Sequence, residues 1–273
     1  MRNGLVAAEL SLATMLLVEA GLLMQSLSRL EKVHLGFRPE GILSFQLAPP
    51  AVKYPDSIKR WTFFREVLQA LSTIPGVTGA AMSSGIPMGQ GSYNRSPFMP
   101  TGSSILPAGT AVPIDWRIAS SGYFRLMGIP PLDGRDFSEQ DRPKATDVII
   151  LSRSAARKLW GDENPIGKMV HRPTIKSSYT VIGVVGEVRH TSLNQEFPCL
   201  YFSAATFTAP LMDMVIRTQG RPDSVLSAAR KPLLIVFRRL ESKRRRDYRW
   251  LGVARSRLNC TACSSFCSSR ASS

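Results

Sequence analysis

An apolar run near the start of the chain constrains its folding more than any other feature. The run extends from Leu5 to Leu27 and reads LVAAELSLATMLLVEAGLLMQSL. As an α-helix, a segment of this length rises about 35 Å, enough to cross a bilayer hydrocarbon core of roughly 30 Å. No later part of the sequence contains a second apolar stretch of comparable length. We therefore expect a single N-terminal transmembrane helix.

Two carboxylates, Glu9 and Glu19, interrupt this run. A charge near the middle of a membrane helix costs about 2.5–3.5 kcal/mol on insertion scales, and such charges usually face protein rather than lipid. A cleaved signal peptide and a soluble core helix are the alternatives. The signal peptide fits less well because its basic region holds only Arg2 and no small-residue cleavage site follows the run. We favour the anchor, with partner helices supplied by other chains.

The charges that flank the run bear on its orientation. Arg2 precedes it, whereas Arg29, Lys32 and Arg38 follow it. Lys and Arg are enriched on the cytoplasmic side of membrane helices. Taken alone, this count places the residues after the helix in the cytoplasm.

The chain of 273 residues has a formal net charge of +15, which by itself suggests a nucleic-acid partner. The charge is unevenly distributed, because residues 230–273 hold 12 Lys/Arg and 2 Asp/Glu. The basic run Arg238–Arg246 could contact phosphates, with Tyr248 and Trp250 stacking on bases. A disordered, charged tail explains the same residues more simply. Nucleic acid is therefore the least favoured partner.

The rest of the sequence predicts an α+β fold. We expect the first helix to continue to Leu35 and stop at Gly36. Residues 42–47 alternate as a strand, 57–74 have helical spacing after Asp56 or Ser57 as a cap, and 77–82 form a strand. Such a strand–helix–strand unit is typical of an α+β layer.

Further along, the predicted elements are short. Residues 83–113 are rich in Gly, Pro, Ser and Thr and predict a long loop. A glycine pair, Gly183 and Gly186, indicates a bulge or a close backbone approach within the strand at 179–188. The other expected elements are strands at 112–118, 148–151, 200–202 and 212–217, and helices at 120–127, at 152–159 with Ser152 as N-cap, and at 222–234.

No stretch of the sequence contains a convincing catalytic, cofactor or metal site. The nearest approach to a phosphate-binding loop, Gly161–Lys168 (GDENPIGK), is followed by Met169 and lacks the hydroxyl that would bind magnesium. It reads better as a turn around Pro165. We expect no catalytic, cofactor-binding or metal-ligating residue in the remaining candidates, which are His34, His171 and His190, the cysteines Cys260, Cys263 and Cys267, and the acids Asp133, Asp136, Glu139 and Asp141, taken as solvated.

Several motifs, in the same order along the chain, resemble those of the MacB-like permeases of ABC transporters, including the duplicated permeases of acidobacteria. The similarity covers roughly residues 1–231. The matching stretches are the N-terminal run, Phe63–Glu66 and Ile74–Val77 (FFRE, IPGV), Tyr123–Arg125, Gly128–Pro130, Gly134–Phe137 (GRDF), Leu159–Trp160, Asn164–Lys168 (NPIGK) and Val181–His190 (VIGVVGEVRH).

The resemblance implies a periplasmic core domain of small βαβ-type lobes, inserted after the first membrane helix of an inner-membrane protein. It implies conformational coupling and no catalysis by this chain, because ATP is hydrolysed by a separate ABC ATPase. Other permease helices, a second copy and the bilayer are the implied partners. This orientation places the amino terminus inside, against the charge count.

The resemblance defines three segments: an anchor at 1–36, a MacB-like periplasmic core at 37–231, and a basic tail at 232–273. Glu19 stands where the family has a small residue. The match ends near Lys231, and the tail is rich in Arg, Ser and Cys. We expect an incomplete core and a truncation or frameshift near Pro232. A membrane-tethered binding or sensing module is the alternative function.

Overall fold

The computed structural model describes residues 2–31, 35–87, 94–138, 141, 147–189 and 197–219. It divides into two compact units, Met1–Leu35 and Gly36–Ser273. The helix expected at 222–234 and the whole of the basic tail lie outside the described residues.

The first unit contains one helix, α1 (Arg2–Glu31). Its apolar side chains between Leu10 and Met24 are exposed, with Leu17 at 76% and Met24 at 75%. Among the described residues, no helix combines the length and apolar character needed to cross a bilayer. The expected continuation to Leu35 passes through residues 32–34, which are not described.

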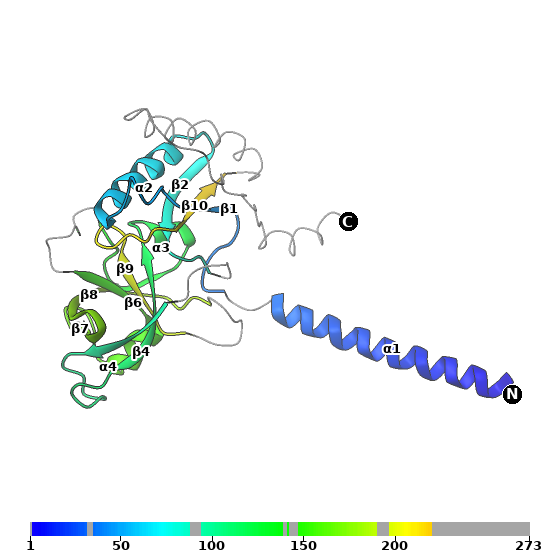
Figure 1. Ribbon diagram of the computed structural model, residues 1–273. Helices are drawn as coiled ribbons and strands as arrows, with labels where there is room; N and C mark the ends of the chain where they lie inside the picture. Colours follow the sequence, from blue (N-terminus) through cyan, green and yellow to red (C-terminus); the bar gives the residue numbers. More distant parts are fainter. Residues whose placement is uncertain are drawn as a thin grey trace. The chain divides into compact units, whose positions relative to one another are not determined.

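In the second unit, a three-stranded layer carries one long helix. The strands are β1 (Ile42–Leu47), β2 (Val77–Ser83) and β10 (Met212–Thr218), and α2 (Ser57–Ser72) covers one face (Figure 1). The predicted strand–helix–strand unit is confirmed, and Asp56 is its N-cap, accepting the Lys59 N–H at 2.8 Å. No local pattern indicated that β10 lies between β1 and β2, where it pairs antiparallel with both.

Alternation along β10 assigns its side chains to two faces. Met212, Met214 and Ile216 pack beneath α2 with Phe64 and Leu71, all fully or almost fully buried. Val215 belongs to a different core on the opposite face. Asp213 and Arg217 share the register of Val215 and therefore point the same way.

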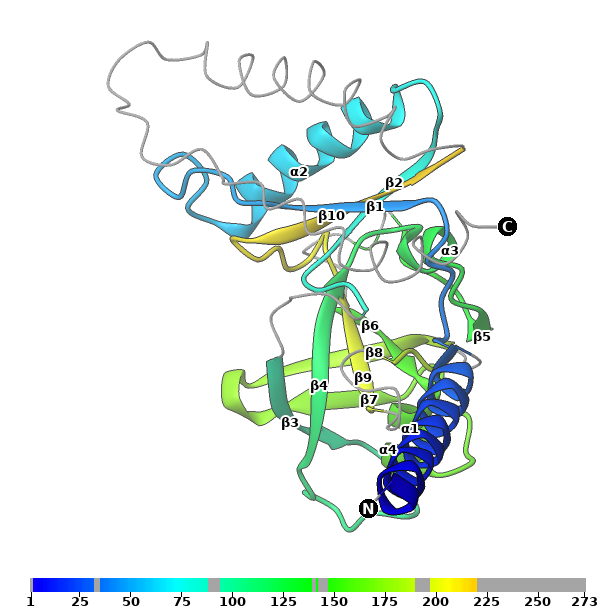
Figure 2. The same ribbon diagram turned by 90° about the vertical axis from the view of Figure 1, so that its right-hand side faces the viewer.

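The remaining strands form a second lobe in which the pairings close on themselves. The order is β4–β3–β7–β8–β6–β9, and β9 pairs in parallel with β4 again. Figure 2 shows these strands grouped apart from the layer and α2. The strands of this ring are β3 (Asn94–Pro100), β4 (Val112–Ala119), β6 (Val148–Ser152), β7 (Met169–Arg172), β8 (Ser177–Val185) and β9 (Cys199–Ser203).

Three short helices and one strand complete the described lobe. They are α3 (Tyr123–Met127), β5 (Pro131–Gly134), α4 (Arg153–Trp160) and the 3-10 turn η1 (Pro173–Ile175). Ser152 is the N-cap of α4, as predicted, and accepts the Ala155 N–H at 3.3 Å. The helix expected from Ser120 begins only at Tyr123, because the Ser120 hydroxyl accepts the Met82 N–H of β2 at 3.0 Å.

The core of the ring is aromatic. Phe202 lies 4.8 Å from Tyr179, 5.5 Å from Trp116 and 6.3 Å from Phe98, measured between ring centroids. Edge-to-face pairs at such distances add to the stabilisation from burial. A separate core, which includes Tyr123, Phe124 and Tyr201, fills the space between the layer and the ring.

The loop expected over residues 83–113 is wrong in part, because β3 lies within it. Two prolines, Pro97 and Pro100, hid the strand, since proline donates no backbone hydrogen bond. In the structure, Pro97 lies opposite Pro113 of β4, and Met99 and Pro100 pair with β7. Long-range pairing on both sides therefore maintains a strand with a poor local signal.

The close approach expected at the glycine pair is confirmed. A Cβ on Gly183 would lie 2.4 Å from the Arg135 carbonyl oxygen, and one on Gly186 would lie 2.7 Å from Pro130. The register of β6 against β8 also shifts where Ile150 meets Gly183. The strand ends at Val185 rather than continuing to Val188, because the Gly186 N–H turns to the Pro130 carbonyl at 2.8 Å.

We predict that Gly183→Ala lowers the free energy of unfolding by about 1–3 kcal/mol or more, because the added methyl collides with backbone that cannot rotate away. Gly109→Ala is the matched control, since its φ is +81° but no atom lies within 4 Å of the added Cβ. It should cost only about 1–2 kcal/mol, from left-handed backbone strain. Denaturant melts of the full chain in detergent measure both, and a smaller loss for Gly183→Ala than for Gly109→Ala would contradict the steric argument.

Candidate functional site

The described residues offer little reactive chemistry. No group of three or more His, Cys, Asp or Glu among them could hold a metal ion. Cys199 is buried, and that burial raises the pKa of its thiol to about 12. The thiol therefore stays protonated at neutral pH and is a poor nucleophile.

The stretch that resembles a phosphate loop serves as a turn, as expected. Residues 161–162 and 166–167 adopt turn conformations after α4. Lys168 forms an ion pair with Glu163 and lies 5.7 Å above the Trp160 ring. This lysine is therefore already engaged within the domain.

One of the three histidines, His171, lies within the described residues. His171 lies on β7, where its Nδ1 is 3.2 Å from the Ser178 hydroxyl. His34, His190, Cys260, Cys263, Cys267 and the basic run lie outside the described residues.

The expectation that the acids between residues 133 and 141 are solvated is wrong for two of them. Asp141 is 8% exposed and paired with Arg135. Asp136 accepts the Phe137 N–H at 2.7 Å, and burial raises the pKa of its carboxyl despite a further hydrogen bond from the Gly122 N–H. Asp133 is exposed, as expected, and Glu139 is not described.

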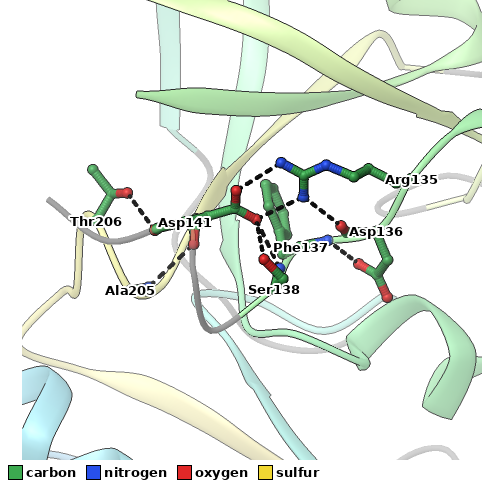
Figure 3. A network of polar contacts seen from close by, with 8 residues as sticks. Arg135, Asp136, Phe137, Ser138, Asp141, Ala205 and Thr206 are labelled. Atoms are coloured by element: carbon green, nitrogen blue, oxygen red, sulfur yellow. Dashed lines mark hydrogen bonds and ion pairs between the residues drawn. The ribbon is translucent and has the colours of Figure 1, made fainter. Parts of the chain in front are cut away.

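Figure 3 shows the network that the motif Gly134–Phe137 builds. The Arg135 guanidinium donates two hydrogen bonds to Asp141, at 2.9 and 2.7 Å. The Ser138 N–H and hydroxyl donate to the same carboxylate at 2.7 and 3.1 Å. Thr206 donates to the Asp141 carbonyl at 3.3 Å. The network therefore connects the chain after β5 with the loop between β9 and β10.

A second set of contacts fixes the point where the chain enters the folded unit. We call residues Gly36–Gly41 the entry segment. The Arg38 N–H donates to the Met127 carbonyl of α3 at 2.8 Å, and the Thr218 N–H of β10 donates to the Gly41 carbonyl at 2.8 Å. Phe37 packs against the core between the layer and the ring. The entry segment thus contacts both lobes.

Arg217 concentrates these contacts in one side chain. Its Nε donates to the Leu126 carbonyl at 2.7 Å, Nη1 to the Glu40 carbonyl at 2.8 Å and Nη2 to the Arg38 carbonyl at 3.0 Å. All three nitrogens of one planar guanidinium thus bind backbone oxygens, two of them in the entry segment and one in α3. We call this arrangement the Arg217 clamp.

Gly36 allows the entry segment to lie close to the chain after β8. A Cβ on Gly36 would meet the Glu187 carbonyl oxygen at 1.9 Å, and the φ of Gly36 is +80°. Glu187 in turn accepts the Ser154 N–H and hydroxyl at the start of α4, at 2.9 and 2.8 Å. The sequence identified Gly36 only as a helix stop.

These contacts bring together motifs that lie far apart in the sequence. The chain around Tyr123–Pro130, the Gly134–Phe137 motif and the Val181–Arg189 stretch all lie next to the entry segment or to one another. Sequence reasoning missed Arg217, because a lone arginine at the end of a strand carries no local signal. Its position on the inward face of β10 could have been noticed only once that strand was placed.

We predict that Asp141→Asn lowers the free energy of unfolding at pH 7 by about 1–3 kcal/mol, the usual cost of losing charged hydrogen bonds. The hydrogen bonds from Arg135, followed by those from Ser138, hold the pKa of Asp141 below its usual value. The contribution is therefore complete above about pH 4, the unfolded pKa, and disappears as the pH falls through the lower folded pKa.

Asp162→Asn is the control, because the Asp162 side chain is 94% exposed and its ion pair with Arg157 is long, at 3.7 Å. It should change stability by less than about 0.5 kcal/mol. Chemical denaturation at pH 7 and pH 3 measures both variants. An Asp141→Asn effect that grows toward pH 3 would refute the assignment.

Comparisons with known proteins are consistent with this structure. The family model described as "MacB-like periplasmic core domain" matches residues 23–231. "Macrolide export ATP-binding/permease protein MacB" of Bdellovibrio bacteriovorus is 35% identical over 65 residues, which cover 24% of this chain and 10% of that protein. The protein of the same name from Chromobacterium violaceum is 32% identical over 65 residues, with the same coverage. The aligned region spans about a tenth of the length of these curated relatives.

Two solved structures are also similar. The periplasmic region of MacB from Actinobacillus actinomycetemcomitans matches with a TM-score of 0.49 and 16% identity, over 78% of this chain and 90% of that one. The extracellular domain of the noncanonic ABC-type transporter YknZ from Gram-positive bacteria matches with a TM-score of 0.47 and 16% identity, over 72% and 94%.

The mixed α and β architecture predicted from the sequence is confirmed, and so is the resemblance to MacB-like permeases. The family match extends over well over half of the sequence and includes every strand of both lobes. This chain belongs to the family of MacB-like periplasmic core domains.

Proposed function

We propose that this chain is a permease component of an ABC transporter that couples ATP hydrolysis by a partner to movement of an extracytoplasmic domain. Residues 1–36 are the anchor in the cell membrane, 37–231 the periplasmic core and 232–273 a basic tail. The proposed partners are an ABC ATPase, further permease helices and a second copy of the chain. Support comes from the family match and from the names of the MacB relatives.

The anchor rests on the sequence run Leu5–Leu27 rather than on a span identified in the structure. Leu16, Leu17, Val18, Leu22 and Leu23 are each at least 56% exposed. Since successive helical residues turn by about 100°, these apolar side chains point in several directions around α1. A helix that is apolar on most sides needs an apolar environment on most sides. Lipid and neighbouring membrane helices would supply it.

The coupling proposal rests on how the chain enters and leaves the layer. Ile42, the first residue of β1, is paired with Arg217 near the end of β10. The Gln219 N–H then donates to the Gly76 carbonyl at 2.8 Å. Entry and exit are therefore adjacent, as expected for a domain inserted between membrane segments. A displacement of either segment would reach both.

The Arg217 clamp is the observation that carries the proposal. It binds the entry segment to α3, which packs in the core between the two lobes. A pull on the entry segment would thus move the layer and α3 together instead of detaching the entry segment from them. The clamp needs no catalytic residue, which fits a domain that transmits motion.

We predict that Arg217→Lys opens the clamp while the lobes stay folded, because one ammonium cannot replace the planar fork of three donating nitrogens. Hydrogen exchange of the full chain should show at least tenfold faster exchange at the Arg38 and Thr218 amides and unchanged exchange within α2. Arg157→Lys is the control, since Arg157 is 67% exposed. In the assembled transporter, Arg217→Lys should retain ATP hydrolysis and lose transport. Equal loss of both activities would argue against a coupling role.

We also predict that the domain faces the extracytoplasmic side of the membrane. Val52 lies in the loop after β1 and is 79% exposed. In a chain whose Cys260, Cys263 and Cys267 are replaced by serine, Val52→Cys should react with a membrane-impermeant maleimide in intact spheroplasts. Buried Cys199 should remain unlabelled.

The anchor itself is tested by alkaline extraction of the same membranes. The full chain should stay in the pellet, and Leu16→Lys with Leu17→Lys should release it, because each buried charge costs about 2.5–3.5 kcal/mol. Val52→Lys should have no effect. Labelling of Val52→Cys only after lysis would favour the orientation that the flanking charges indicate.

A further inference from the structure

A pocket of about 400 Å³ lies between the layer and the ring, on the inward face of β10 and at the opposite end of that strand from Arg217. Its volume is within the range of small-molecule sites in proteins. One wall comes from β1 and β10, the other from β4, and the loop between β9 and β10 forms the rim. None of these residues belongs to the clamp or to the network of Figure 3.

The wall on the ring side is aromatic. Trp116 and Phe207 make an edge-to-face pair with centroids 6.0 Å apart. Phe207 is 43% exposed, and Leu211, which also lines the pocket, is 48% exposed. Large apolar side chains that remain this accessible at the mouth of a pocket favour a ligand with an apolar body.

The opposite wall contains a carboxylate, Asp213, which is only 4% exposed. Asp213 is paired in register with Gln46 of β1 and with Ser83 of β2. Gln46 donates a hydrogen bond to it, and the positive charge nearby is the buried Arg117 of β4. Burial nevertheless outweighs both and raises the pKa of Asp213 to about 6.

This environment discriminates between ligand charges. A carboxylate offers about four acceptor positions, more than one glutamine can fill. An ammonium ion entering the pocket would add donors and an opposite charge to a site where burial disfavours the ionised acid. Arg117 does not line the pocket, so an anion entering it would meet the Asp213 carboxylate and be repelled. The remainder of the ligand would contact the aromatic wall.

We propose that this pocket binds a compact organic ammonium ion, with its charged nitrogen at Asp213 and its apolar body against Trp116, Phe207 and Leu211. The proposal is independent of the transport function, because it needs neither the anchor nor an ATPase. It assigns a binding role to the end of the inward face of β10 that lies away from the clamp.

The test is calorimetric titration of the full chain in detergent micelles at pH 7.5, with micelles alone as the blank. The probes are 2-phenylethylamine, its neutral analogue 2-phenylethanol and the anion 3-phenylpropanoate. The amine should bind at least tenfold more tightly than the alcohol, and the anion should not bind. Asp213→Asn should reduce the affinity for the amine to that for the alcohol. Phe207→Ser should weaken the binding of both the amine and the alcohol.

Asp147→Asn is the matched control, because burial also raises the pKa of the Asp147 carboxyl but it lies outside the pocket. It should leave the affinities unchanged. If Asp213→Asn fails to fold, the pH dependence of amine binding to the wild-type chain tests the proposal instead. The amine keeps its charge between pH 7.5 and pH 5, with a pKa near that of lysine at about 10, whereas Asp213 becomes protonated below about 6.

Amine affinity should therefore fall at least fivefold at pH 5 while that of the alcohol stays constant. Equal binding of amine and alcohol would overturn the proposal. So would amine binding that is insensitive to both Asp213→Asn and pH, or an absence of amine binding at millimolar concentration.

Discussion

The structure depends on the insertion of β10 between β1 and β2. Without it, the two strands joined by α2 would face each other across an unfilled space, and the backbone groups on both inner edges would lack partners. The pairing joins Ile42 to Arg217, so it closes a loop of most of the domain. Loop-closure entropy grows only slowly with length, and six residue pairs on each side of β10 offset it.

The same strand organises both faces of the layer. Its methionines and Ile216 complete the core under α2, while Val215 joins the core toward the ring. The inward face also has polar residues at its two ends, with Arg217 at the entry segment and Asp213 in the pocket. A single strand thus connects the two places where we assign function. Neither place requires the domain to carry out a reaction.

Local signals in the sequence were reliable where the physics is local. Asp56 and Ser152 cap the helices they were expected to cap, because a side chain that accepts an N–H three residues away needs no distant partner. Gly183 and Gly186 correctly indicated a close approach of two chain segments. They did not indicate that the approaching segments contain Arg135 and Pro130. The strands β1 and β8 were also recognised.

The predictions that failed concern features whose stability comes from residues far away in the sequence. β3 contains two prolines and is maintained by its pairing with β4 and β7. Asp141 was expected to be solvated, but in the folded chain it accepts hydrogen bonds from Arg135 and Ser138. Arg217 and Asp213 are unremarkable in the sequence, and what matters is the face of β10 on which they lie.

The amino-acid order alone was enough to identify the apolar N-terminal run, the family, the mixed α and β class and the principal capped helices. These follow from composition, periodicity and contacts within a few residues. Three features became evident only in the folded chain: β10 divides β1 from β2, the strands of the second lobe close into a ring, and Arg217 reaches three carbonyls. Such features arise from groups whose partners lie far away in the sequence, 84 residues where β9 meets β4 and 91 or more for Arg217. No local pattern of side chains encodes which partner that will be.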